Sequence, residues 1–261
     1  MPKPPKPPKP PTVTDSRRAT PPQAGGPPGG ASQQRSVILL RHGRTAWNAE
    51  RRFQGQANPP LDDVGRMQAY EVAPLIAALR PQVLISSDAD RARQTAEPIA
   101  ALTGLDLLVD ARLRERSLGH WEGLTRPEVQ QRYPEEFAAW IAGKDVTQFG
   151  RGGESRDDVA ARAMAVFAEL PRVETAVLVT HGATSMALAA AVLGLPQTVH
   201  SLGPLANCHW SELVVEYHAA ESGEPGESIW RLRAHNVGVP GTVVPLAVGP
   251  GPIDDASDAE A

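Results

Sequence analysis

Two short stretches of this sequence place a histidine directly before a glycine at the end of an apolar run. The first is Arg41-His42-Gly43-Arg44, which follows the apolar residues 37–40. The second is His181-Gly182, which follows the apolar residues 176–179. Imidazole can act as a nucleophile, acid or base near neutral pH, and guanidinium groups bind phosphate oxygens through a planar fork of donors. One such histidine is more often structural, but two at equivalent places favour a reactive site.

The elements that must position these histidines are buried strands. Short continuous apolar runs are typical of strands covered on both faces of a parallel sheet. In open α/β sheets the carboxyl ends of such strands form the edge where ligands bind. The remaining pattern alternates strand and helix, with strands predicted at 83–85 and 107–109 and helices at 62–79, 88–102, 155–170 and 184–193. We therefore expect an α/β fold, a three-layer sandwich in which helices cover both faces of a mostly parallel central sheet.

Local signals set several of these boundaries. Asp62 is placed to cap one helix, and Ser155 with Asp158 resembles a capping box. Gly104 and Gly194 are placed to end two helices. Residues 125–133 and 134–142 predict two short helices, 112–123 has no clear period and predicts a loop, and 207–217 with 229–235 predict a final strand pair.

Composition excludes several functional classes. The chain has 261 residues, a net charge of −4 and a pI of about 6.0, so it lacks the overall positive charge that is typical of nucleic-acid-binding proteins. Cys208 is the single cysteine, and neither HxxxH nor CxxC spacing occurs, so we expect no metal and no cofactor. No apolar run is long enough to span a membrane and no signal peptide precedes the first strand. We expect a cytoplasmic protein without a membrane or nucleic-acid partner.

Both ends of the chain are predicted to be disordered. Residues 1–34 hold 11 of the 26 prolines and open with a KPP repeat. They therefore have few apolar side chains that could be buried in a core. Residues 237–261 carry four acidic side chains and no basic one. The folded domain is accordingly expected at 35–236. A docking role for the basic N-terminal tail stays open beside the simpler interpretation of a solvated extension.

Further motifs make the chain resemble the histidine phosphatase superfamily, the phosphoglycerate-mutase-like group. Residues 86–96, SSDADRARQTA, are similar to its second arginine motif, and residues 113–123, LRERSLGHWEG, to the segment that holds its acid. Gly152 to Ser155 and Thr180-His181-Gly182 complete the family's order. The resemblance spans about residues 37–235 and implies a phosphoglycerate-mutase-like fold.

The resemblance assigns roles that suit the chemistry of phosphoryl transfer. His42 is expected to be the nucleophile that forms a phosphohistidine, and Glu115 the proton donor and acceptor. Protonated His181 would stabilise the transition state. Glu122 is the alternative acid. The expected phosphate ligands are Arg41, Asn48, Arg91 and His181, with Arg44, Gln54 and Gly55 as further candidates; Arg44 is equally placed to face solvent or a substrate carboxylate.

The family includes hydrolases and mutases. Only 36 residues separate Glu115 from Gly152, less than the insertion usual in mutases of the family, so we expect a metal-independent phosphatase acting on small phosphorylated metabolites such as sugar or glycerate phosphates. Residues 152–162, 207–213 and 229–236 resemble actinobacterial glucosyl-3-phosphoglycerate phosphatases and related broad-specificity phosphatases. A phosphoglycerate mutase and a non-catalytic docking protein remain the alternatives. The expected assembly is a monomer or a homodimer.

Overall fold

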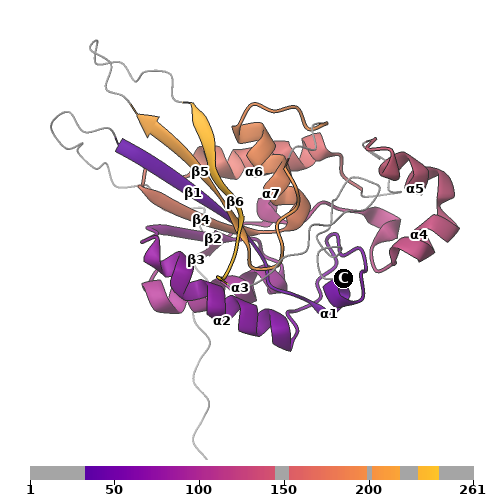
Figure 1. The fold of residues 1–261 in the computed structure, drawn as a ribbon, viewed down its shortest axis with the longest axis horizontal. Coiled ribbons are helices and arrows are strands. Elements are labelled where there is room, and N and C mark those ends of the chain that lie inside the picture. Colours follow the sequence, from indigo (N-terminus) through magenta and orange to yellow (C-terminus); the bar gives the residue numbers. More distant parts are fainter. Residues whose placement is uncertain (1–32, 145–152, 199–201, 218–228, 241–261) are drawn as a thin grey trace, which may run out of the picture. The chain divides into compact units, whose positions relative to one another are not determined.

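The computed structural model describes residues 33–144, 153–198, 202–217 and 229–240. The strands among these residues form one sheet in the order β3-β2-β4-β1-β5-β6 (Figure 1). β3, β2, β4 and β1 are parallel, β5 is antiparallel to β1, and β6 is antiparallel to β5. This confirms the predicted mostly parallel sheet. The strands are β1 Gln33–Arg41, β2 Val83–Ser86, β3 Leu107–Val109, β4 Thr175–Thr180, β5 Trp210–Tyr217 and β6 Trp230–Val237.

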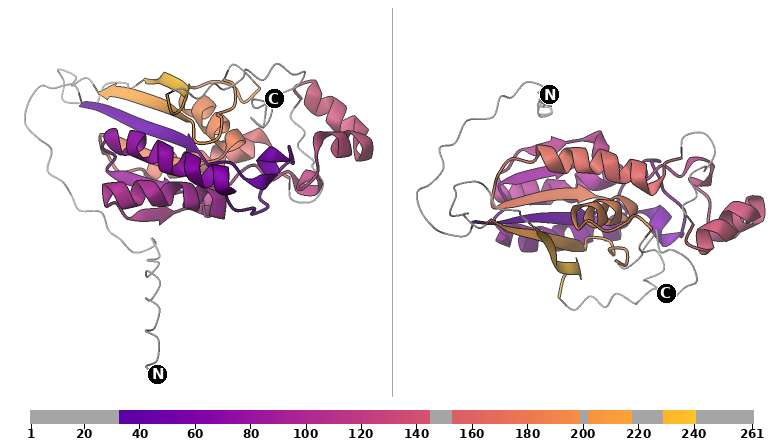
Figure 2. Two further views of the ribbon diagram at one scale, coloured as in Figure 1. Left: turned by 60° about the horizontal axis from the view of Figure 1, so that its bottom comes forward. Right: turned by 90° about the horizontal axis from the view of Figure 1, so that it is seen from above.

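Helices cover the two faces of the sheet in pairs (Figure 2). On β1, Ile38 and Leu40 pack toward α2 and α3, whereas Val37 and Leu39 pack toward α6 and α7, and all four side chains are fully buried. Burying an aliphatic side chain of this size contributes roughly 1.5–3 kcal/mol, so the continuous apolar run stabilises both layers at once. The four helices are α2 Asp63–Ala78, α3 Asp90–Thr103, α6 Arg156–Glu169 and α7 Gly182–Val192.

The predicted helix boundaries are confirmed at several ends. Asp62 accepts a hydrogen bond from the Gly65 N–H and caps α2. Ser155 and Asp158 form the expected capping box of α6. Gly104 ends α3 in the left-handed conformation with φ 70°, which glycine adopts without steric cost.

The short helices α1, α4 and α5 lie at the edge of the sheet where the parallel strands end (Figure 1). Phe53, Trp121 and Trp140 pack there in an aromatic cluster, with Phe53 ring centroids 5.2 and 5.7 Å from the two tryptophans. These elements are α1 Ala46–Ala49, α4 Arg126–Arg132 and α5 Pro134–Ile141, with the 3₁₀ turns η2 Ala111–Leu113 and η3 Gly119–Trp121.

Several features differ from the sequence-based expectation. β1 begins at Gln33, inside the predicted tail, because its polar first residues pair with β5 through the backbone. β6 continues to Val237, one residue past the predicted domain end, through its pairing with β5. α7 begins at Gly182, and α1 was not expected. The predictions of disorder at 1–32 and 241–261 lie outside the described residues.

None of the helices in the described part of the chain is both long enough and apolar enough to cross a membrane.

Candidate active site

Two adjacent parallel strands bring the two His-Gly motifs together. β1 and β4 pair with Arg41 opposite Thr180, and the His42 N–H donates to the Thr180 carbonyl at 3.0 Å. The next residues along both strands are therefore neighbours: the ring centroids of His42 and His181 lie 5.1 Å apart. Both side chains are buried. Parallel pairing thus joins two motifs that are far apart in sequence.

The ring of His42 has a defined tautomer. Its Nδ1 lies 2.7 Å from the Gly43 carbonyl oxygen, which can only accept, so Nδ1 carries the proton. The lone pair is then on Nε2. Burial lowers the pKa of His42 well below its ordinary value, and the positive charges of Arg91 and Arg41 lower it further. The imidazole is neutral near pH 7, the form in which Nε2 is nucleophilic.

His181 is also held neutral by its partners. The Arg91 Nε–H donates to His181 Nδ1 at 3.2 Å, so the ring proton is on Nε2, which donates to Ser87 Oγ at 2.9 Å. Burial, and then the charge of Arg91, lower the pKa of His181 well below its ordinary value. The expected protonated His181 is therefore not the form that this arrangement favours, because a guanidinium instead of an anion faces Nδ1.

Arg91 is oriented by the loop that follows α1. Its Nη1 donates to the Ala57 carbonyl at 2.6 Å and its Nη2 to the Gly55 carbonyl at 2.9 Å. Gly55, a candidate phosphate ligand, thus lies at the site and acts through its carbonyl on Arg91. On the other side, Arg41 Nη1 donates to the Leu205 carbonyl at 2.7 Å. Both guanidinium groups are buried.

Asn48 and Gln54 each present a buried polar atom without a hydrogen-bond partner among the described residues. For Asn48 the atom without a partner is the donor Nδ2. The other atom of its amide, Oδ1, accepts from the Thr45 N–H and hydroxyl. For Gln54 it is Oε1. A buried donor without a partner is costly, so the Asn48 amide is suited to an added anion.

Glu115 lies at the N-terminus of α7. Its carboxylate oxygens accept hydrogen bonds from the Ala183 N–H at 3.2 Å and the Thr184 N–H at 3.1 Å. Burial is the largest influence and raises the pKa of Glu115 above its ordinary value, although the Arg116 N–H and the charge of Arg91 act against it. A carboxyl with a raised pKa can hold a proton for a leaving group.

Most of these groups line one cavity, whereas His181 and Asn48 are not among its lining residues. Arg41, His42, Arg91 and Glu115 share it with Gln54, Gly55 and Ala183. The remaining lining side chains are Phe53, Arg116, Leu118, Trp121 and Trp140. The cavity thus combines buried guanidinium groups, a nucleophile and an acid, which together suit a phosphate ester.

Two predicted candidates lie elsewhere. Arg44 is turned away, because its Nε donates to Asp62 at 2.9 Å beside the start of α2, and it does not line the cavity. Glu122 accepts from the Gln56 and Leu118 N–H groups and supports the surrounding loops. It is not among the cavity-lining residues, so the geometry favours Glu115 as the acid.

Ser87 and Arg116 contribute to the site but are not among the residues that the sequence predicts for it. Ser87 follows β2 and accepts from His181, a contact between residues 94 positions apart that no local pattern shows. Arg116 is 1% exposed and follows Glu115 in a loop of charged residues. Such a loop has no helical or strand periodicity from which the direction of a side chain could be predicted. Within the described residues, no group of three His, Cys, Asp or Glu side chains is arranged to hold a metal ion.

Comparisons with known proteins agree with this geometry. The model of the histidine phosphatase superfamily (branch 1) matches residues 37–224. The chain is 38% identical over 216 residues to a glucosyl-3-phosphoglycerate phosphatase of Mycolicibacterium vanbaalenii, covering 77% of this chain and 94% of the relative. It is also 38% identical over 182 residues to a probable phosphoglycerate mutase of Salmonella paratyphi C, covering 68% and 83%.

Solved structures show the same likeness. A mycobacterial glucosyl-3-phosphoglycerate phosphatase in complex with VO3 aligns with a TM-score of 0.67 at 37% identity, covering 77% of this chain and 98% of that structure. With its paired strand-end histidines and the match over residues 37–224, the chain belongs to the histidine phosphatase superfamily, branch 1.

Proposed function

We propose that this protein is a phosphomonoester hydrolase that acts through a phosphohistidine on His42. The observation that carries the proposal is the fixed tautomer of His42. Its Nδ1 is bound to the Gly43 carbonyl at 2.7 Å, which leaves the lone pair on Nε2, and the cavity that His42 lines also includes Arg41, Arg91 and Arg116. Near neutral pH this is a nucleophile beside a site for phosphate oxygens.

The first step is transfer of the phosphoryl group to the enzyme. Arg41, Arg91 and the Asn48 amide hold the nonbridging oxygens, and His42 Nε2 attacks phosphorus in line with the ester oxygen. The N–P bond forms as the P–O bond to the leaving group breaks. Glu115 gives its proton to the departing oxygen and becomes a carboxylate, and the product alcohol leaves.

The second step returns the enzyme to its starting state. The Glu115 carboxylate takes a proton from water as the water oxygen attacks the phosphorus of phosphohistidine. The N–P bond breaks, inorganic phosphate is released, and neutral His42 and protonated Glu115 are restored. No metal enters either step, because the positive charge comes from the guanidinium groups.

His181 changes its role when phosphate is present. A phosphate oxygen that binds between Arg91 and His181 would accept from Arg91 and free Nδ1, while the anion favours a protonated imidazole. Ser87 continues to accept from Nε2. His181 then donates to the phosphate and stabilises the transition state, as the family pattern implies.

The substrate class is a small phosphorylated metabolite, with sugar or glycerate phosphates favoured. The relatives that match most of the chain include enzymes named glucosyl-3-phosphoglycerate phosphatase, and others named phosphoglycerate mutase. Hydrolysis is favoured over phosphoryl transfer to a second hydroxyl by the short segment between Glu115 and Gly152. We place the reaction in the cytoplasm, where the single buried thiol, Cys208, would stay reduced.

A rapid-quench experiment tests the proposal. Incubation with 3-phosphoglycerate labelled in its phosphate should trap enzyme-bound phosphate that is stable to base and labile to acid, and inorganic phosphate should accumulate without 2-phosphoglycerate. His42→Ala should abolish both signals, and EDTA should leave turnover unchanged. Full activity of His42→Ala, or activity lost to EDTA and restored by a divalent metal, would refute the mechanism; accumulation of 2-phosphoglycerate would establish the mutase alternative.

A further inference from the structure

The acid of the proposed reaction lies on a segment without regular secondary structure. Residues 114–118, which include Glu115, connect the turns η2 and η3 and belong to no helix or strand. The hydrogen-bond ladder of a helix or sheet therefore does not fix the direction of the Glu115 carboxyl. We call residues 114–118 the acid segment. Contacts from other parts of the chain must hold it in place.

Arg162 of α6 binds carbonyl groups of the acid segment and of the turn before it. Its Nη1 donates to the Arg112 carbonyl at 2.7 Å and to the Arg114 carbonyl at 2.6 Å. Its Nη2 donates to the carbonyl of Glu115 itself at 3.0 Å. Because a guanidinium group presents its donors in a rigid fork, these three carbonyls are held in fixed positions relative to one another.

Glu154, which lies just before α6, orients Arg162 and binds the acid segment as well. Its carboxylate accepts from Arg162 Nε at 2.8 Å and from Nη2 at 3.1 Å. The same carboxylate accepts from the Ser117 N–H at 2.8 Å, and the Glu154 N–H donates to the Ser117 carbonyl at 3.0 Å. Arg162 and Glu154 together thus bind the acid segment on both sides of the Glu115 side chain.

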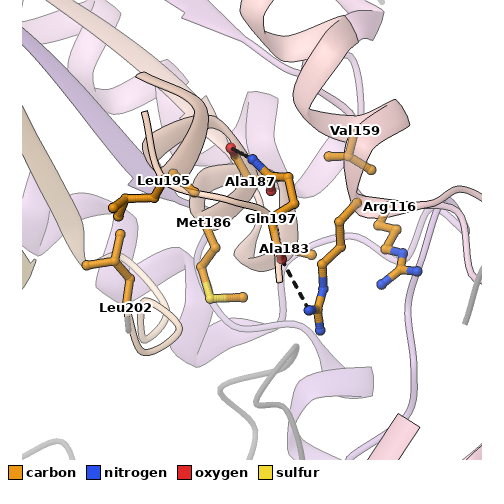
Figure 3. A pocket seen from close by; sticks show the side chains of 10 residues that line it. Arg116, Val159, Ala183, Met186, Ala187, Leu195, Gln197 and Leu202 are labelled. Carbon is orange, nitrogen blue, oxygen red and sulfur yellow. Dashed lines mark hydrogen bonds between the residues drawn. The ribbon is translucent and has the colours of Figure 1, made fainter. Parts of the chain in front are cut away.

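The residue that follows the acid is bound at the same place. Arg116 Nε donates to the Glu154 carbonyl at 2.8 Å. The Arg116 side chain lines a pocket between α6 and α7, and Val159 and Ala183 also form its wall (Figure 3). Ala183 is the residue whose N–H donates to the Glu115 carboxylate at 3.2 Å. The acid segment is therefore held from the side of α6 and from the side of α7.

These two sets of contacts respond differently to the proton that Glu115 carries. The Ala183 and Thr184 N–H groups of α7 bind the carboxylate oxygens, and a protonated carboxyl accepts such bonds less strongly because it is neutral. Arg162 binds the backbone carbonyl of Glu115, which carries no titrating proton. The contacts from Arg162 therefore persist in the protonated form that donates to a leaving group.

We propose that Arg162, oriented by Glu154, is a positioning residue for the general acid: it fixes the acid segment so that the Glu115 carboxyl faces the leaving oxygen. This inference rests on the proposed phosphatase function, with Glu115 as the acid. It adds to that function a residue that acts from outside the active site, since Arg162 is not among the residues that line the cavity.

Arg162→Met tests the assignment with two esters that differ in their need for an acid. The methionine side chain removes every donor that binds the acid segment. On glycerol 3-phosphate, which expels an alkoxide, kcat/KM should fall about 10- to 100-fold, because a catalytic group displaced by about 1 Å costs on the order of 10²-fold in rate. On p-nitrophenyl phosphate, whose leaving group needs no proton, kcat/KM should change by less than about threefold.

The Glu115→Gln background separates a positioning role from a purely structural one. This variant has no proton to donate, so the addition of Arg162→Met should lower kcat/KM on glycerol 3-phosphate by less than about threefold. If Arg162 only stabilised the fold, its loss would cost the same factor with and without the Glu115 proton. The measurement is a double-mutant cycle on one ester, with the four proteins compared under the same conditions.

Arg233→Met is the matched control. Arg233 also forms an ion pair with a glutamate through two hydrogen bonds, to Glu212, and its loss changes the net charge equally. Its partner lies on β5, away from the acid segment, so kcat/KM should stay within about twofold on both esters. Arg162→Lys keeps a positive charge for Glu154 without the fork of donors, and it should recover part of the loss on glycerol 3-phosphate.

Arg162→Lys also replaces Arg162→Met in the cycle if the methionine variant does not fold. An unchanged kcat/KM on glycerol 3-phosphate, equal losses on the two esters, or a loss that persists in full in the Glu115→Gln background would overturn the inference. The proposed function fails on other observations, namely if the unmodified enzyme hydrolyses neither ester or if Glu115→Gln leaves the rate on glycerol 3-phosphate unchanged.

Discussion

At the scale of single residues, the site shifts the pKa values of a base and an acid in opposite directions. His42 has a lowered pKa because it is buried beside two arginines, and Glu115 has a raised pKa because its carboxyl is buried. The two shifts act in opposite directions on groups whose ordinary values lie about two units apart. Both groups can therefore hold the forms that catalysis requires over the same range of pH.

These shifts predict an acid-shifted, bell-shaped dependence of kcat/KM on pH for glycerol 3-phosphate. As pH falls through the lowered pKa of His42, below 6.5, the nucleophile is protonated and activity is lost. As pH rises through the raised pKa of Glu115, above 4.5, the acid loses its proton and activity falls again. Steady-state rates across this range measure both limbs. A profile that rises steadily through neutral pH would contradict the assignment of Glu115.

Glu115→Gln supplies the control for the alkaline limb. The amide keeps the shape and cannot donate the proton, so the limb should disappear and the rate on glycerol 3-phosphate should fall about 10²- to 10⁴-fold. Phosphorylation by p-nitrophenyl phosphate should fall much less, because nitrophenolate leaves without a proton. Equal losses for both substrates in single-turnover phosphorylation would transfer the acid role to another residue, and Glu122 would be tested next.

At the scale of elements, the loop between β1 and α1, which carries His42, is fixed by the close approach of two helices, α2 and α3. The Gly43 N–H donates to the Thr95 hydroxyl of α3 at 2.9 Å. The Asp62 N–H, just before α2, donates to the Arg44 carbonyl at 3.1 Å. The first turn of α2 packs so closely on this loop that a Cβ on Gly65 would lie 1.9 Å from the Arg44 carbonyl oxygen. Backbone contact between α2 and the loop therefore sets the position of His42.

Gly65→Ala should displace the loop and slow catalysis. A methyl group cannot fit against the Arg44 carbonyl, so α2 and the loop must separate, and a shift of about 1 Å at a nucleophile can cost on the order of 10²-fold in rate. We expect kcat/KM to fall at least 10-fold and Tm to decrease. Gly203→Ala is the matched control, since a Cβ there has nothing within 4 Å. Equal behaviour of the two variants would show that the close packing does not position His42.

At the scale of the whole molecule, the described sheet begins at Gln33 and the described lining of the cavity begins at Arg41. The N-terminal residues 1–32 add five basic side chains and one acidic one, Asp15, to a chain with a net charge of −4. Their KPP repeat is the feature on which the docking alternative depends. Catalysis and docking can therefore be separated by deleting this segment.

Deletion of residues 1–32 should leave kcat/KM for p-nitrophenyl phosphate within twofold and Tm unchanged, because β1 is kept whole. The measurement compares full-length and truncated protein side by side. A truncated protein that folds normally but loses turnover would show that the tail takes part in catalysis. If turnover persists while capture of a binding partner is lost, the tail has a docking role beside the enzyme's activity.

The sequence by itself determined the elements and the residue types of the site. The apolar runs of β1 and β4 predict buried strands, and the Ser155–Asp158 pair and Gly104 predict helix ends, because each of these signals acts over a few residues. The family motifs then pointed to His42, Arg91 and Glu115. α1 has only four residues, too few for a helical period, although Thr45 and Asn48 do form a capping box.

Tertiary structure decided where the side chains point and which proton states they hold. Arg44 lies beside the nucleophile in sequence, yet Asp62 of a neighbouring element turns it away from the cavity. His181 is neutral because it is buried and because the guanidinium of Arg91, 90 positions away, faces its Nδ1, and Arg116 enters the wall of the active-site cavity from a loop without a regular period. Burial and contacts between distant segments set these properties, and a linear pattern of residues contains neither.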